Sequence, residues 1–251
     1  MDKSAMAEHA MRFFNARQQR FEIRRKQPIA GMRQLVAELY LKGDGLEIGA
    51  LDSPLRLPDG ARARYVDRLN MTELREHYPG LDLIDIDIVD DGEHLASVPP
   101  ASQAFIVANH FLEHCQDPIR TLETLASRLK PEGVLYLVVP DADFTFDRKR
   151  PSTAFAHIAE DHASGPQQSR EQHFREWVSL VEDNTDAAAA EQRVRTLMEM
   201  GYSVHFHVWR MHELLEFFAR SIDEFGLPVR LELALRHGIE VICILRRLAT
   251  P

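Results

Sequence analysis

The sequence predicts an α/β fold: a doubly wound, mostly parallel, Rossmann-like sheet with a C-terminal antiparallel hairpin and a helical lid insertion. Between residues 43 and 140, short apolar runs alternate with helical stretches, a pattern typical of parallel strands joined by helices. Near the C-terminus, two β-rich runs at 229–235 and 239–245 are separated by a turn of hairpin length. A long polar stretch lies between these two parts and predicts the insertion.

The elements follow in order along the chain. Apolar positions at roughly helical spacing among basic residues predict an amphipathic helix over 3–26, and a second helix follows Pro28 and ends at Gly43. In the following part of the chain, short apolar runs predict five parallel strands, at 46–48, 63–66, 83–88, 104–108 and 134–139. A helix is predicted before the fifth strand, at about 118–129. Helices are expected in the insertion at 171–181 and 187–200.

We expect these elements to form one domain over residues 1–251. The N-terminal helices occupy 1–42 and the ligand-binding core occupies 43–140. The helical insertion follows at 141–202, and the C-terminal part of the sheet is at 203–251. The length suits such a sheet, because open α/β sheets commonly use a whole chain of this size.

Composition and charge exclude several classes of protein. The chain is 45% hydrophobic and 27% charged, which excludes collagenous and mostly disordered proteins. A formal net charge of −9 gives no overall positive field, so no nucleic-acid partner is expected. Apolar runs are too short to span a bilayer, no secretory signal core is evident, and two distant cysteines cannot form a disulfide framework. We expect a cytoplasmic protein without a membrane span; its oligomeric state is left open.

Polar residues at the ends of the predicted strands indicate a nucleoside site, because open parallel sheets bind ligands beyond the carboxyl ends of their strands. Gly49 follows the first strand, where the backbone can pass close to a ligand. Asp67 ends the second strand, 18 residues later, near the spacing at which a carboxylate accepts both ribose hydroxyls. Asp87 and Ile88 end the third strand and would contact an adenine. Either aspartate could instead cap the following helix.

These acid-tipped strands, followed by Asn109 and by the Lys-Pro-Glu-Gly turn at 130–133, resemble the class I S-adenosylmethionine-dependent methyltransferases. The resemblance covers residues 45–140 and resumes in the C-terminal hairpin. It implies S-adenosylmethionine as the cofactor. It also implies a set of cofactor-binding residues: Glu47, Gly49 and Ala50 for the methionine part, Asp67 for the ribose, Asp87 and Ile88 for the adenine, and Asn109 beside the sulfonium. The turn departs from the family pattern, because Gly49 is its only glycine.

Three histidines are the candidates for catalysis. An oxygen or ammonium acceptor must lose a proton during methylation, a task suited to histidine. His205 and His207 lie two apart in a β-rich segment and would share one face of a strand, while His110 follows the fourth strand. A pair of histidines on a strand is more commonly a hydrogen-bonded structural pair, and the two could also ligate a metal with His173 or Asp141. No metal is assigned.

The sequence therefore predicts an S-adenosylmethionine-dependent methyltransferase acting on an oxygen or nitrogen of a small molecule, such as a sugar or glycan precursor. The alternative is a non-catalytic nucleoside-binding or partner-binding module on the same fold. A nicotinamide dehydrogenase is disfavoured, because the first turn lacks the Gly-x-Gly-x-x-Gly pattern.

Overall fold

The computed structural model describes residues 29–249, and the helix predicted over 3–26 lies outside them. The strands are β1 (Gly43–Ile48), β2 (Ala61–Asp67), β3 (Ile88–Val89), β4 (Gln103–Asn109), β5 (Leu129–Pro140), β6 (Val229–His237) and β7 (Glu240–Arg247). The α-helices are α2 (Ile29–Tyr40), α3 (Met71–His77), α4 (Pro118–Arg128), α5 (Phe155–Ser164), α6 (Arg170–Leu180), α7 (Ala187–Glu199) and α8 (Met211–Phe225). Short 3-10 turns are η1 (Leu112–His114), η2 (Ala142–Phe144) and η3 (Phe146–Lys149).

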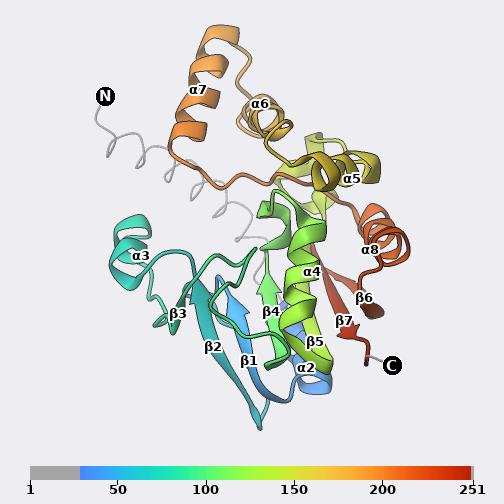
Figure 1. Cartoon of the computed structure of the whole chain (residues 1–251). Helices are drawn as coiled ribbons and strands as arrows, with labels where there is room; N and C mark the ends of the chain where they lie inside the picture. Colours follow the sequence, from blue (N-terminus) through green and yellow to red (C-terminus); the bar gives the residue numbers. More distant parts are fainter. Residues whose placement is uncertain (1–28, 250–251) are drawn as a thin grey trace.

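The strands form one seven-stranded sheet in the order β3-β2-β1-β4-β5-β7-β6 (Figure 1). The first five strands are parallel, and β7 runs antiparallel between β5 and β6. The predicted fold class and hairpin are therefore confirmed. Because the strand order reverses between β1 and β4, their carboxyl ends mark the switch point where such sheets bind ligands.

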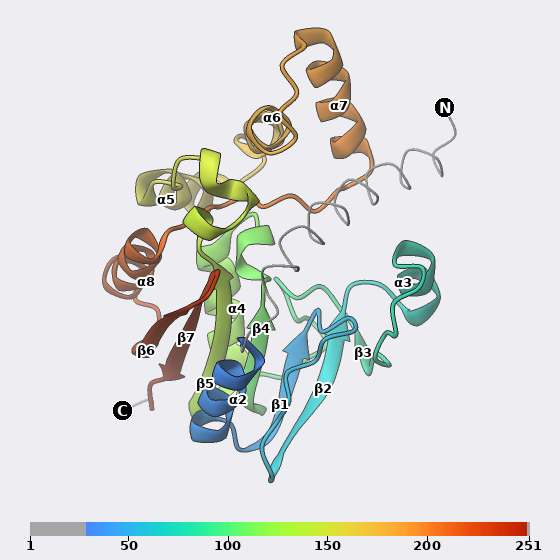
Figure 2. The same cartoon turned by 180° about the vertical axis from the view of Figure 1, so that it is seen from behind.

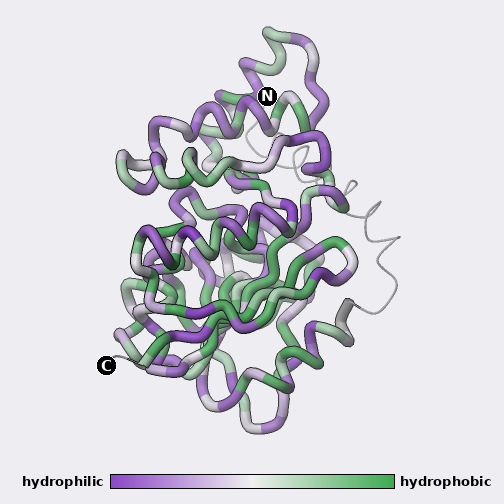
Figure 3. Tube along the Cα trace, turned by 90° about the vertical axis from the view of Figure 1, so that its right-hand side faces the viewer, coloured by the Kyte–Doolittle hydropathy of each residue, from purple (hydrophilic) through white to green (hydrophobic). Residues whose placement is uncertain are grey.

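Both faces of the sheet are covered, which explains the continuous apolar runs of the central strands. In β4, Phe105 and Val107 belong to the core under α2, whereas Ile106 and Ala108 belong to the core under α4 and α8. This alternation follows from the two-residue period of a strand. Seen from behind, α2 lies across the sheet (Figure 2), and the strands form the hydrophobic centre of the molecule (Figure 3).

The insertion lies over the carboxyl edge of the sheet. In Figures 1 and 2, α5, α6 and α7 stand above the ends of β1 and β4. Helices α6 and α7 have a small core of their own, which includes Phe174, Trp177 and Leu197. Both helices agree with the predicted ranges within one residue at each end, whereas α5 and α8 were not predicted. No described helix meets the length and hydropathy needed to cross a bilayer.

Two sequence expectations are wrong. The strand predicted at 83–88 is reduced to the two residues of β3, so Asp87 precedes this strand rather than ending it. The segment that carries His205 and His207 is not a strand; its one ladder contact is an isolated bridge between Trp209 and Asp141. The segment is held instead by the Glu113 carbonyl, which accepts the backbone N–H groups of Phe206 and His207.

Candidate active site

The turn after β1 is open on the side where a ligand would pass. Gly49 adopts φ +65°, and its N–H donates to the Val66 carbonyl at 2.9 Å. Apart from Gly49 and its two neighbours in the chain, no heavy atom of residues 29–249 lies within 4 Å of the position that a Cβ would occupy on Gly49. Ala50, which follows, is buried. The glycine is therefore needed for its backbone conformation and leaves one side of the turn uncovered.

Glu47 and Asn109 meet at the carboxyl ends of β1 and β4. Both carboxylate oxygens of Glu47 accept the Leu55 N–H, at 2.9 and 3.0 Å, and the Asn109 amide lies 3.4 Å from Oε1. Burial raises the pKa of Glu47 to about 7, against smaller opposing contributions from its hydrogen bonds and Arg33. Asn109 Oδ1 is buried with no hydrogen-bond partner among the described residues. Such an atom is expected to face a ligand or water.

Glu47→Gln is expected to make the stability of the cofactor-free protein less dependent on pH. Because the folded-state pKa is raised, the contribution of Glu47 to stability is greatest at low pH and declines as the pH rises from about 4.5 to about 7. The neutral amide avoids this loss, so relative to wild type the variant should gain about 2–3 kcal/mol between pH ~5 and pH ~8. Urea unfolding at the two pH values measures the difference.

Glu38→Gln, which changes an exposed glutamate on α2, is the matched control and should show no such gain. A Glu47→Gln gain that is the same at both pH values would show that this carboxyl does not titrate near neutrality.

Asp67 lies at the carboxyl end of β2 and is not the cap of a helix. Its Oδ1 accepts the Leu69 N–H at 3.0 Å, and burial raises its pKa. The cap of α3 is Asn70, whose side chain accepts two backbone N–H groups while Glu73 completes a capping box. The helix-capping alternative for Asp67 is therefore wrong, and its carboxylate remains the candidate for the ribose.

The acidic residues at the carboxyl end of β3 are Asp90 and Asp91, whereas the sequence predicts Asp87 there. Asp87 Oδ2 accepts the Tyr65 N–H of β2 at 2.8 Å, and Ile88 pairs with Val66. Residues 90–92 follow β3, and a Cβ on Gly92 would lie 2.7 Å from Ile48 and 2.8 Å from Phe111. This loop therefore packs against the tip of β1. The Asp-Asp-Gly sequence could have indicated a loop at the end of this strand, but the strand predicted at 83–88 ends two residues before it.

His110 is fixed at the tip of β4 by a partly buried ion pair. Its Nε2 lies 3.0 Å from Glu240 Oε2 and 3.0 Å from Arg33 Nη2, and Arg33 donates two hydrogen bonds to Glu240 at 2.7 and 2.6 Å. Burial alone would raise the pKa of Glu240, but hydrogen bonds from His110 and Arg33 outweigh it and hold the pKa at about 2. The cluster ties α2 to β7 and orients the His110 ring.

His205 forms a buried pair with Asp147, a residue that the sequence did not single out as a site residue. His205 Nδ1 lies 2.6 Å from Asp147 Oδ2, and Arg150 donates to Asp147 Oδ1 at 3.0 Å. Burial opposes ionisation of Asp147, but His205 and Arg150 together lower its pKa. The ionised carboxylate accepts, so His205 carries its proton on Nδ1. In the neutral form of the ring, the lone pair is then on Nε2.

A buried carboxyl group lies on the Nε2 side of His205. Glu113 Oε1 is 4.0 Å from His205 Nε2, and both Glu113 carboxyl oxygens lack a hydrogen-bond partner in the described part of the chain. Burial raises the pKa of Glu113. The rings of Phe146, Trp177 and His114 surround His205 at centroid distances of 4.9, 5.7 and 4.6 Å. The arrangement combines a proton acceptor with unsatisfied polar atoms in an aromatic setting.

His207 belongs to a separate group, which we call the three-histidine cluster: His157, His173 and His207. One ligand atom of each residue lies within 4.8 Å of the other two. Burial lowers the pKa of His207 to about 3, and burial with the neighbouring His157 lowers that of His173 to about 4. His205 and His207 are therefore not one unit.

Comparisons with known proteins support one family. A family model described as a methyltransferase domain matches residues 22–199, and no curated protein matches the chain. Among solved structures, the chain is similar to a Haloferax volcanii protein that is provisionally described as a methyltransferase and was solved in complex with the activator Trm112. The two are 12% identical, the match covers 88% of this chain and 89% of that one, and the TM-score is 0.51. A Rhodobacter sphaeroides protein provisionally described as a Zn-dependent alcohol dehydrogenase is 16% identical, with coverage of 89% and 92% and a TM-score of 0.53. At such identities, these two structures show a shared fold alone.

Proposed function

The chain belongs to a family of methyltransferase-domain proteins, and from this premise we propose that it uses S-adenosylmethionine to methylate an oxygen or nitrogen atom of a small polar molecule, such as a sugar or glycan precursor. The observation that carries the acceptor assignment is the 2.6 Å contact between His205 Nδ1 and Asp147 Oδ2. An oxygen or ammonium acceptor must lose a proton as the methyl group arrives, and this pair can take it.

The cofactor supplies an electrophilic methyl group on a sulfonium. Glu47 with the turn at Gly49 and Ala50 would hold the methionine part, and Asn109 would contact the sulfonium end. The unpartnered Asn109 Oδ1 and the uncovered side of Gly49 support this fit, because both are at the switch point of the sheet.

Asp67 would bind the ribose hydroxyls, because its carboxylate is at the carboxyl end of the neighbouring strand. Asp87 and Ile88 remain the candidates for the adenine. The Asp-Asp-Gly loop at 90–92 is a further candidate, because it follows β3 and packs against the tip of β1.

We assign the base to His205. Asp147 orients the imidazole and offsets the charge that forms when Nε2 takes the acceptor proton, while Arg150 holds Asp147 in place. The carboxyl oxygens of Glu113 favour an acceptor that carries hydroxyl or amino donors, because such donors would satisfy them.

The other two candidates are less suited to this role. His110 Nε2 already lies within hydrogen-bond distance of Glu240 and Arg33. His207 Nε2 lies 3.2 Å from the Gln116 carbonyl, and the ring contacts the other members of the three-histidine cluster. Both are therefore assigned supporting roles.

The proposal is tested with S-adenosylmethionine carrying a labelled methyl group. Purified protein is incubated with this cofactor and a bacterial extract separated into small-molecule and macromolecular fractions, and label is counted in each. We expect enzyme-dependent label in the small-molecule fraction. Label confined to protein or nucleic acid would overturn the small-molecule assignment, and cofactor binding without transfer in any fraction would favour the non-catalytic module.

A further inference from the structure

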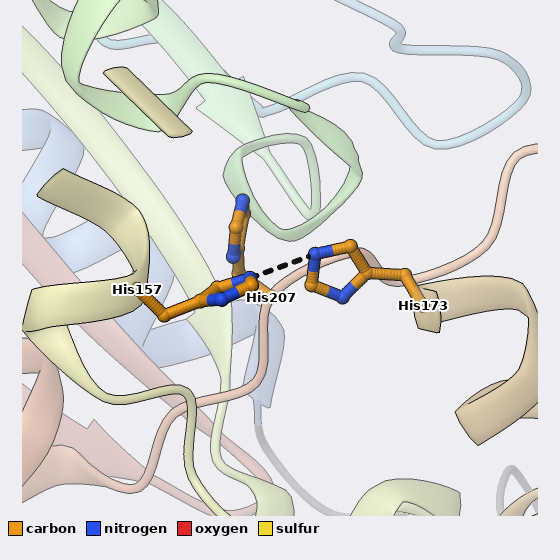
Figure 4. Close-up of side chains that lie close together, drawn as sticks. All are labelled: His157, His173 and His207. Carbon is orange, nitrogen blue, oxygen red and sulfur yellow. Dashed lines mark hydrogen bonds between the residues drawn. The ribbon is translucent and has the colours of Figure 1, made fainter. Parts of the chain in front are cut away.

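The three-histidine cluster has a geometry that the methyltransferase proposal does not use. His157 Nε2 lies 3.1 Å from His173 Nε2, and Figure 4 shows the three rings close together. Asp161, one helical turn after His157 on α5, places Oδ2 3.3 Å from His157 Nε2 and 3.8 Å from His173 Nε2. In a tetrahedral zinc site with Zn–N bonds of about 2.0–2.1 Å, neighbouring ligand atoms lie about 3.3–3.4 Å apart. The separations among His157, His173 and Asp161 are close to this spacing, and a ring nitrogen of His207 lies within 4.8 Å of ring nitrogens of His157 and His173.

The hydrogen bonds around the cluster leave lone pairs available for a metal. A neutral His207 that donates from Nε2 to the Gln116 carbonyl, 3.2 Å away, carries its lone pair on Nδ1. That Nδ1 atom is buried and has no hydrogen-bond partner within residues 29–249. Asp161 is fixed on its other side, since Oδ1 accepts from Ser169 Oγ at 2.7 Å. Outer hydrogen bonds of this kind orient the ligands in metal sites.

We propose that the three-histidine cluster, with Asp161 as a fourth ligand, binds one zinc ion as a structural site. Three imidazole nitrogens and one carboxylate oxygen are a donor set that zinc accepts, whereas magnesium and calcium prefer oxygen ligands. Four protein ligands leave no open position, which is typical of a structural rather than a catalytic zinc.

The ligands come from three separate segments of the C-terminal half. His157 and Asp161 are on α5, His173 is on α6, and His207 is on the segment that leads to α8. A zinc ion here would fix the insertion to the chain that carries His205, two residues before His207. The metal would therefore stabilise the fold near the active site without contacting the reacting atoms.

The test uses the full chain without an affinity tag, equilibrated with zinc and then gel-filtered. We expect about one zinc ion per chain by elemental analysis and a lower melting temperature after chelation. Cobalt in place of zinc should give the intense visible absorption of tetrahedral coordination. His157→Gln is the main variant, because this side chain is the most exposed of the three histidines. It should bind zinc at least about tenfold more weakly, and chelator should lower its melting temperature less than that of the wild type.

His212→Gln, an exposed histidine on α8, is the matched control and should keep the zinc. Glu113→Gln tests the other group with suitable spacing, formed by Glu113, His114 and His205. Zinc lost from Glu113→Gln but kept by His157→Gln would overturn the assignment. So would a wild-type chain that binds no zinc. A melting temperature unchanged after zinc removal would contradict the structural role.

Discussion

His205→Gln is expected to lower kcat by about 10²–10⁴-fold while the affinity for S-adenosylmethionine stays unchanged. Glutamine can occupy the place of the imidazole, but it cannot take a proton from the acceptor. The cofactor is held by other residues in our proposal, so binding and turnover should separate. Single-turnover kinetics with the acceptor found in the extract, together with calorimetry for the cofactor, measure the two effects.

Asp147→Asn provides the second half of this test. The amide keeps the shape of the side chain but cannot offset the charge of a protonated His205, so kcat should also fall. His212→Gln, which changes an exposed histidine on α8, is the matched control and should retain wild-type kcat. A His205→Gln protein that turns over at the wild-type rate and only melts earlier would make the pair structural and remove the base from the mechanism.

Asp67→Asn should weaken binding of S-adenosylmethionine and of S-adenosylhomocysteine by about 10- to 100-fold. In the proposed complex, the two carboxylate oxygens accept hydrogen bonds from two ribose hydroxyls. An asparagine has only one acceptor oxygen, and its NH₂ group would place a donor opposite the second hydroxyl. Both ligands share this ribose, so the two losses should be equal within error. Isothermal titration calorimetry on the folded variant measures them.

Asp44→Asn makes the same change of charge at the opposite end of the sheet, where Asp44 is exposed at the start of β1. Its affinity should match that of the wild type. Unchanged affinity in Asp67→Asn, or a wild-type preference for a nicotinamide dinucleotide, would contradict the cofactor assignment.

The sheet could be predicted because each of its main strands is marked by a pattern of residues that are close together in the sequence. The apolar runs of β4 and β5 are buried on both faces, and the hairpin of β6 and β7 has a short turn. Helix α8 was missed although Leu214, Phe217 and Ser221 recur at helical spacing and are buried. The strand at 83–88 was misplaced because alternating acidic and apolar residues imitate a half-buried strand.

The candidate site could be predicted only in part, because its partners are far apart in the chain. Asp147 and His205 are separated by 58 positions and His110 and Glu240 by 130. No spacing rule links such residues. The sequence pattern predicts His205 and His207 on one face of a strand, but the segment is not a strand and each side chain belongs to a different cluster.

The most direct test of the proposed reaction is the identity of the atom that receives the methyl group. S-adenosylmethionine with a ¹³C-labelled methyl is incubated with the protein and the active small-molecule fraction, and the product is examined by ¹³C–¹H correlation NMR. We predict a methyl carbon bonded to oxygen or nitrogen, formed by the wild type and strongly reduced in His205→Gln. A methyl carbon bonded to carbon or sulfur, or a product formed equally by both proteins, would contradict the account.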